Sequence, residues 1–263
     1  MAERWLLLAA LLHVLLAAAL LGALRMDGLT PIGGVHPALK PLKFAVSIAI
    51  FLGTMALFVE EAGWSRSASR LLAALLVGTM LVEMACILVQ AARGTTSHFN
   101  THTPFHGGVW STMMLAIVVA TFAMLAAALV ATFSPLDGAS ALRTWAWRLG
   151  LWFFLLVALS GFGMGGRGQH SVGGTDGGVG LAFTNWSTTH GDLRVPHFFA
   201  LHVLQVLPAS AWLLDRLPAP EMVRRGAFAG VVLLASGMCL FTLRQALAGL
   251  PALPPSLERS QQI

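Results

Sequence analysis

Long apolar segments alternate with shorter polar ones along the whole chain. Seven of the apolar segments approach or exceed the roughly 20 residues that a helix needs to cross a bilayer. They cover about residues 5–24, 41–60, 70–92, 109–133, 145–164, 196–214 and 226–248. Strand-like alternation is absent, and lipid tolerates only helices or closed barrels. The pattern therefore predicts an all-α fold, a polytopic bundle of about seven transmembrane helices that forms one integral membrane domain over residues 1–263.

The composition agrees with a membrane protein. Only 10% of the residues are charged, against about 25% in a soluble domain, and the mean hydropathy is +0.77. A net charge of +5 would indicate nucleic acid binding in a soluble protein, but here the basic residues are scattered at the predicted helix ends. The expected partner is therefore the lipid bilayer, and nucleic acid is not expected.

The connections between the predicted spans fall into two kinds. The second, fourth and sixth are short and basic, whereas the first, third and fifth are longer and rich in Gly, His and Thr. Positive charge in short loops favours a cytoplasmic N-terminus and an external C-terminus. In either orientation the three odd connections share one membrane face, and we expect no comparable polar density at the other. They bring three polar segments to that face: His36–Lys43, Arg93–His106 and Gly165–His202.

Basic residues at this face indicate a site for a small anionic molecule. Lys40 and Lys43 open the second span, although an interfacial lysine that extends its amine to water is the alternative for Lys43. We expect Arg93 and Arg194, with nearby histidines, to converge with one of these lysines in a pocket. The candidate ligand-binding residues are Lys40, Lys43, Gln90, Arg93, Asn100, Arg194 and Gln205.

Histidines of the same face are candidate metal ligands. Imidazole groups with oxygen donors nearby can bind a transition metal or haem iron, and exposed polar histidines without any ligand are the alternative. The candidate metal ligands are His98, His190, His197 and His202.

Three polar residues lie inside apolar spans at a similar depth. Glu83, His202 and His13 are each about 14–16 Å from the polar face at a rise of about 1.5 Å per residue. We expect Glu83 to lie within hydrogen-bond reach of His202 or His13, directly or through one water. Such a cluster is either a proton relay or a polar clasp between helices. Glu83, His202 and Asp192, which is also a natural N-cap of the sixth span, are the candidate catalytic residues.

The segment from Gly161 to Gly180 is half glycine. It contains a formal GxGxxG match, but no strand precedes it, so the dinucleotide-binding interpretation fails. The composition instead predicts a flexible or tightly turned loop.

One combination of motifs resembles a known family. The motifs are Lys40-Pro-Leu-Lys43-Phe, Arg93-Gly-Thr-Thr-Ser-His98-Phe-Asn100, Asn185-Trp-Ser-Thr, Gly191-Asp192-Leu-Arg194-Val-Pro-His197-Phe and Leu201-His202-Val-Leu-Gln205. With them the chain resembles, from its second to its sixth span, a family of uncharacterised bacterial polytopic membrane proteins. That family has no known activity, so the resemblance implies only a multi-pass protein of a bacterial inner membrane.

Two function classes remain open. The last span holds neither the lysine of a retinal photoreceptor nor the histidine pair of the seven-helix metal hydrolases that act on lipids. The first class is a metal- or haem-dependent membrane enzyme or redox protein, with a transition metal or haem as cofactor. The alternative is a transporter or sensor for a small, anionic solute.

Overall fold

The computed structural model describes residues 1–177 and 180–253, and in them the chain forms seven helices and one short strand pair. The helices are α1 (Ala2–Ala23), α2 (Leu39–Ala62), α3 (Arg66–Ala92), α4 (Pro104–Phe133), α5 (Ala141–Arg167), α6 (Arg194–Asp215) and α7 (Glu221–Leu247). The strands, β1 (Ser171–Val172) and β2 (Gly191–Asp192), pair antiparallel between α5 and α6. All seven helices are long and apolar enough to span a membrane. The predicted all-α, seven-span bundle is therefore confirmed.

Side-chain caps determine where three of the helices begin. The hydroxyls of Ser65, Thr103 and Ser140 each accept the backbone N–H three residues later, at the starts of α3, α4 and α5. Pro104 follows Thr103 in the first turn of α4, where its missing N–H leaves no hydrogen bond unmade. At the other end of α3, Gly94 takes a φ of +69°, a conformation that glycine adopts readily and that ends the helix.

The helix α5 extends further than the sequence predicts. Instead of turning at Gly161, the chain stays helical to Arg167 and ends at Gly168, whose φ is +66°. Glycine is tolerated in a membrane helix because no water is present to take over the backbone hydrogen bonds. Gly161 also makes room for a neighbour, since an added Cβ would lie 3.2 Å from the ring of His197. The predicted loop is therefore confined to the residues after Arg167.

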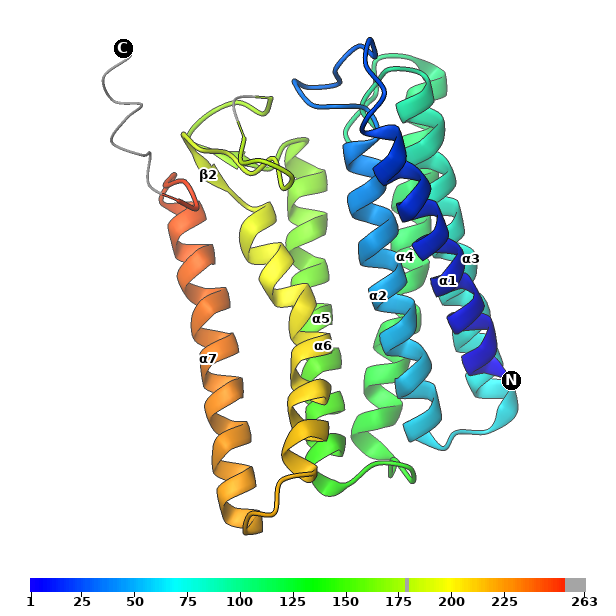
Figure 1. Cartoon of the computed structure of the whole chain (residues 1–263), viewed down its shortest axis with the longest axis vertical. Helices are drawn as coiled ribbons and strands as arrows, with labels where there is room; N and C mark the ends of the chain where they lie inside the picture. Colours follow the sequence, from blue (N-terminus) through cyan, green and yellow to red (C-terminus); the bar gives the residue numbers. More distant parts are fainter. Residues whose placement is uncertain (178–179, 254–263) are drawn as a thin grey trace.

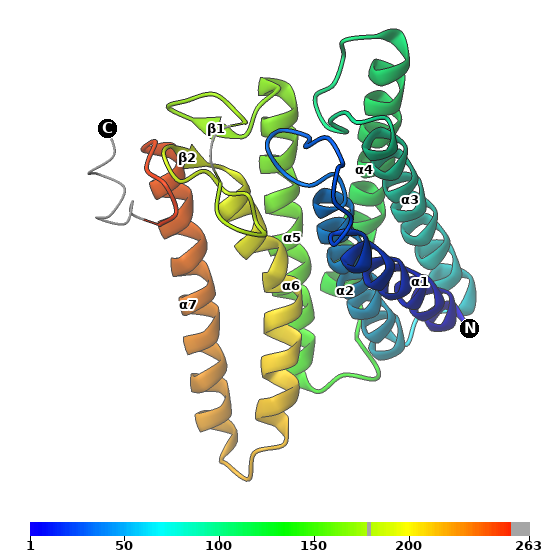
Figure 2. The ribbon, with the colours of Figure 1, turned by 45° about the horizontal axis from the view of Figure 1, so that its top comes forward.

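The helices alternate in direction and pack mainly against their neighbours in the chain (Figure 1). The helices α1 to α4 pack against one another, α5 to α7 follow, and α4 with α5 and α2 with α6 connect the two groups. The connections α1–α2, α3–α4 and α5–α6 all lie at the same end of the bundle as the end of α7, opposite the N-terminus (Figure 1, Figure 2). We call this the polar end. The prediction that the three polar connections share one face is confirmed.

At the opposite end, a network of charges joins the two groups of helices. Arg143 at the start of α5 pairs with Glu61 of α2, and its Nε lies 3.2 Å from Oδ2 of Asp215 at the end of α6. Ser140 donates to the same Asp215 oxygen at 2.6 Å, and the indole of Trp147 donates to Glu61 at 2.8 Å. The expectation that polar groups gather at only one end was therefore wrong. The sequence does not show the pairing because the three helices that contribute, α2, α5 and α6, are far apart along the chain.

The network predicts that Glu61 contributes to the stability of the bundle. In Glu61→Gln, Arg143 loses an ionised partner and Trp147 a strong acceptor, so we expect the free energy of unfolding to fall by about 1.5–3 kcal/mol. Thermal or denaturant unfolding of the purified protein in detergent measures this. The matched control is Glu60→Gln, the same change at an exposed neighbouring position. Equal stabilities of the two variants would contradict the proposed role of the network.

Candidate functional site

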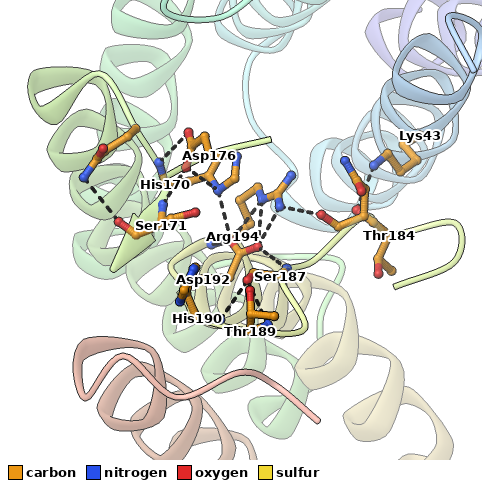
Figure 3. A network of polar contacts seen from close by, with 12 residues as sticks. Lys43, His170, Ser171, Asp176, Thr184, Ser187, Thr189, His190, Asp192 and Arg194 are labelled. Atoms are coloured by element: carbon orange, nitrogen blue, oxygen red, sulfur yellow. Dashed lines mark hydrogen bonds and ion pairs between the residues drawn. The ribbon is translucent and has the colours of Figure 1, made fainter. Parts of the chain in front are cut away.

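Asp192, at the end of β2, is the acceptor around which the α5–α6 connection is built. Its side chain is 1% exposed and accepts the backbone N–H of Ser187 at 2.9 Å and of Arg194 at 3.0 Å. The guanidinium of Arg194 pairs with it at 2.6 Å (Figure 3). The N-cap of α6 is Leu193 rather than Asp192, although the carboxylate still binds the first backbone N–H of the helix. Asp192 therefore fixes the position of Arg194.

His170 lies close to both Asp192 and a second carboxylate, that of Asp176. Its Nδ1 lies 3.3 Å from Asp176 and 3.5 Å from Asp192, and Asp176 also accepts the backbone N–H of Ser171 at 2.9 Å. Burial favours the neutral form of Asp192, but the bonds from His170 and Arg194 outweigh it and hold the pKa of Asp192 well below its usual range. Asp192 is therefore ionised at any physiological pH and balances one positive charge.

Lys43 and Arg194 donate hydrogen bonds to neighbouring backbone carbonyls in the loop that precedes α6. Lys43 of α2 donates from Nζ to the carbonyl of Thr184 at 2.9 Å, and Arg194 of α6 donates to the carbonyl of Asn185 at 2.5 Å (Figure 3). Phe183 and Asn185 both take positive φ values, 65° and 56°, so this backbone is tightly turned. The loop thus connects the first group of helices to the second at the polar end.

Lys40 completes a cluster of three cations. It lies one turn before Lys43 on α2, and it interacts electrostatically with Lys43 and Arg194 as like charges and with Glu83 as an opposite charge. Within the described ranges, no carboxylate forms an ion pair with Lys40 or Lys43. We call Lys40, Lys43 and Arg194 the cation cluster. Only Arg194 has its charge balanced by direct contact.

His98 lies beside this cluster, in the connection between α3 and α4. Its ring centroid is 5.4 Å from those of both Phe44 and Trp110, which cover it. Burial, and then the positive charges of Lys40 and His170, lower the pKa of His98 well below its ordinary value. His98 is therefore neutral near pH 7, and it lies in a region of positive potential.

Two polar side chains of α3, those of Glu83 and Gln90, are buried inside the bundle. Glu83 is 3% exposed, and its Oε1 has no hydrogen-bond partner in the described part of the chain. Gln90, two turns nearer the polar end, is fully buried, and its amide oxygen accepts a hydrogen bond from Nδ1 of His106 at 2.9 Å. Both residues face the interior of the bundle and not the lipid.

The expected direct hydrogen bond between Glu83 and a histidine is not formed. His13 is buried on α1, but its Nδ1 bonds to the carbonyl of Ala9 at 2.7 Å, and its Nε2 is among the atoms without a partner in the described residues. His202 instead pairs with Gln205 of its own helix at 3.2 Å. His202 and Gln205 thus satisfy each other, since residues three apart on a helix are neighbours.

The four candidate metal ligands do not gather at one point. In residues 1–177 and 180–253, no three His, Cys, Asp or Glu side chains lie where they could hold a metal ion. His197 bonds to Ser160 at 2.9 Å, His202 to Gln205, and His98 is enclosed by aromatic rings. In the described residues the donor set therefore does not fit a metal ion held by three or more protein side chains.

Arg93 and Asn100 shape the α3–α4 connection. Arg93 is exposed, and its guanidinium lies 4.5 Å above the ring of Phe105, so it does not converge with Arg194 as expected. Asn100 is buried and donates to the hydroxyl of Thr95 at 2.9 Å. A cation–π contact at the surface holds Arg93 away from the cluster.

Sequence reasoning missed His170, Asp176 and Ser187. The signal was present, because a histidine and a carboxylate six residues apart flank glycines in an otherwise apolar chain. His170 and Ser187, together with Arg194, line a cavity of about 30 Å³, room for a water molecule. It is lined by His170, Ser171, Thr175, Gly177, Asn185, Ser187, Thr189, His190 and Arg194.

Comparisons with known protein families, with characterised proteins and with solved structures find no match. The family resemblance of the motifs stays a prediction, and the function has to be argued from the site.

The neutral state of His98 predicts how the free energy of unfolding depends on pH. Because its folded pKa lies below the unfolded value of about 6.5, the unfolded chain binds more protons at low pH, and stability falls as pH decreases below about 6.5, by at most about 1.4 kcal/mol per pH unit. We expect His98→Asn to reduce this slope, as measured by unfolding between about pH 5 and 7.5. His102→Asn, at an exposed position of the same loop, should leave it unchanged. An unchanged slope in His98→Asn would show that His98 titrates normally.

Proposed function

We propose that this integral membrane protein binds a small anionic solute at the cation cluster and acts as its transporter or sensor. The observation that carries the proposal is the cluster itself. Lys40, Lys43 and Arg194 interact as like charges at the polar end, and in the described residues neither lysine has a carboxylate partner.

The charge balance favours an anion over a cation as the ligand. Two like charges about 4 Å apart repel by about 4 kcal/mol at the effective dielectric of a protein surface, and the repulsion grows with burial. Asp192 balances Arg194, whereas in the described residues no carboxylate forms an ion pair with Lys40 or Lys43. A bound anion would remove this repulsion, whereas a metal ion would add to it.

The remaining polar groups offer donors to such an anion. Thr184 Oγ1, beside the carbonyl that Lys43 holds, is buried without a partner among the described residues, and so is the amide nitrogen of Gln90. Ammonium, hydroxyl and amide donors together suit a carboxylate or an inorganic oxyanion. The same set offers no open coordination site, so we do not retain the metal- or haem-dependent enzyme as the preferred function.

The proposal predicts specific stabilisation by small anions. Nitrate, sulfate and succinate are tested against the purified protein in detergent, with thermal stabilisation and calorimetry as readouts. We expect at least one to bind, and Lys40→Met and Lys43→Met each to weaken binding at least about tenfold, the value of one charge-assisted hydrogen bond.

The matched control is Arg93→Met, which removes an exposed positive charge at the same end and should keep the wild-type affinity. A wild-type protein that binds none of the three anions, or lysine variants that bind as well as wild type, would contradict the proposal.

We further propose an inner-membrane location with the polar end external. Basic residues in the three short connections support it, because positively charged short loops stay in the cytoplasm. Reporter fusions after Ser67 and after Gly177 should then report the cytoplasm and the external side, respectively. The reverse result would invert the orientation, and a shared compartment would contradict the alternation of the helices.

A further inference from the structure

We propose that binding of an anion at the cation cluster is coupled to the uptake of one proton by Glu83, so that the anion and a proton bind together. This inference rests on the proposed anion site and adds a second ligand to it, the proton, at a residue deeper in the membrane.

The position of Glu83 is unusual for an acid. It lies nine residues before the end of α3, about 14 Å into the span at about 1.5 Å per residue, and is 3% exposed. Its Oε1 has no hydrogen-bond partner in the described part of the chain. An ionised carboxylate at this depth without a contact partner is costly, whereas the protonated acid is much less so.

Among the described residues, Lys40 is the one group of opposite charge that acts on Glu83. From α2, Lys40 acts on it electrostatically. From α1, His13 is buried but bonds to a backbone carbonyl. From its own helix Cys86 is close enough to interact, and from α4 His106 is engaged by Gln90. In residues 1–177 and 180–253 no ion pair joins Glu83 to any of these groups, so the opposite charge of Lys40 acts on it without direct contact.

Lys40 therefore links the acid to the anion site. It interacts with Glu83 on one side and with Lys43 and Arg194 on the other. When Glu83 is ionised, it cancels one unit of the positive charge that attracts the anion and also repels the anion directly. When Glu83 takes a proton from the aqueous phase, that charge is restored and the anion binds more tightly. By reciprocity, a bound anion favours the protonated form of Glu83.

The coupling has a direct consequence for the charge of the complex. A monoanion that binds with one proton leaves the total charge of the site unchanged, so entry of the anion into the low dielectric of the bundle is less opposed. A transporter built this way would carry anion and proton in the same direction, and a sensor would respond to the anion more strongly in acid.

The test compares wild type with Glu83→Gln, a neutral side chain of nearly the same shape. Binding of nitrate, sulfate and succinate is measured from about pH 6.5 to 8.5, a range in which His98 stays neutral because its pKa lies well below the ordinary histidine value of about 6.5. Wild-type affinity should fall as pH rises, by up to about tenfold per pH unit for one proton. Glu83→Gln should bind at every pH with the affinity that wild type has in acid.

Calorimetry in two buffers of different protonation enthalpy counts the protons directly. We expect close to one proton taken up per anion by wild type and none by Glu83→Gln, with the difference removing any titration of the probe itself. The control Glu60→Gln removes an exposed carboxylate of α2 and should behave as wild type.

The other possible outcomes distinguish failure of the proton coupling to Glu83 from failure of the anion site. If wild type binds an anion without taking up a proton, or Glu83→Gln keeps the pH dependence because Lys40 is the group that titrates, the coupling to Glu83 is wrong and the anion site stands. If wild type binds none of the three anions at any pH, the anion site itself is wrong. Should Glu83→Gln fail to fold, Glu83→Leu takes its place, with the same expected loss of proton uptake and of pH dependence.

Discussion

A charged group that leaves water needs an opposite charge close to it, and both ends of this bundle are arranged around that requirement. At the end that holds the N-terminus the requirement is met, because Arg143 contacts Glu61 and Asp215 directly. At the polar end it is met for Arg194 by Asp192, but Lys40 and Lys43 have no such contact among the described residues. The first arrangement holds helices together, whereas the second leaves two lysines without a carboxylate in contact, which is the basis of the anion site that we propose.

The fold could be predicted from the sequence almost completely, because the length of apolar segments is set by the thickness of the bilayer and not by tertiary contacts. All seven spans lie where hydropathy places them. The one clear failure was the end of α5, where glycines such as Gly161 suggested a loop. In water glycine weakens a helix, but in lipid the unpaired backbone of a loop is the worse alternative. The need to satisfy backbone hydrogen bonds within lipid, which favours helical spans, therefore also explains why a loop at Gly161 was wrongly predicted.

The site could be predicted only in part. Counting helices brings the three polar connections together, which is how Lys40, Lys43, His98 and Arg194 come to lie in one region. The number of helices does not, however, predict which residue a given side chain contacts. Arg93 stacks on the ring of Phe105, and His202 pairs within its own helix, since both had a nearer partner than the cluster. The charges of the other end were equally hidden, because Glu61 and Arg143 lie 82 residues apart.

The hydrogen bond from Lys43 to the carbonyl of Thr184 also concerns how the chain is made. The two residues are 141 positions apart. A ribosome that adds about 5–20 residues per second therefore delivers Thr184 about 7–28 seconds after Lys43. Until then Lys43 lacks the carbonyl that it contacts in the finished structure. This link between the two groups of helices therefore cannot form before the chain has been made as far as the residues that lead into α6.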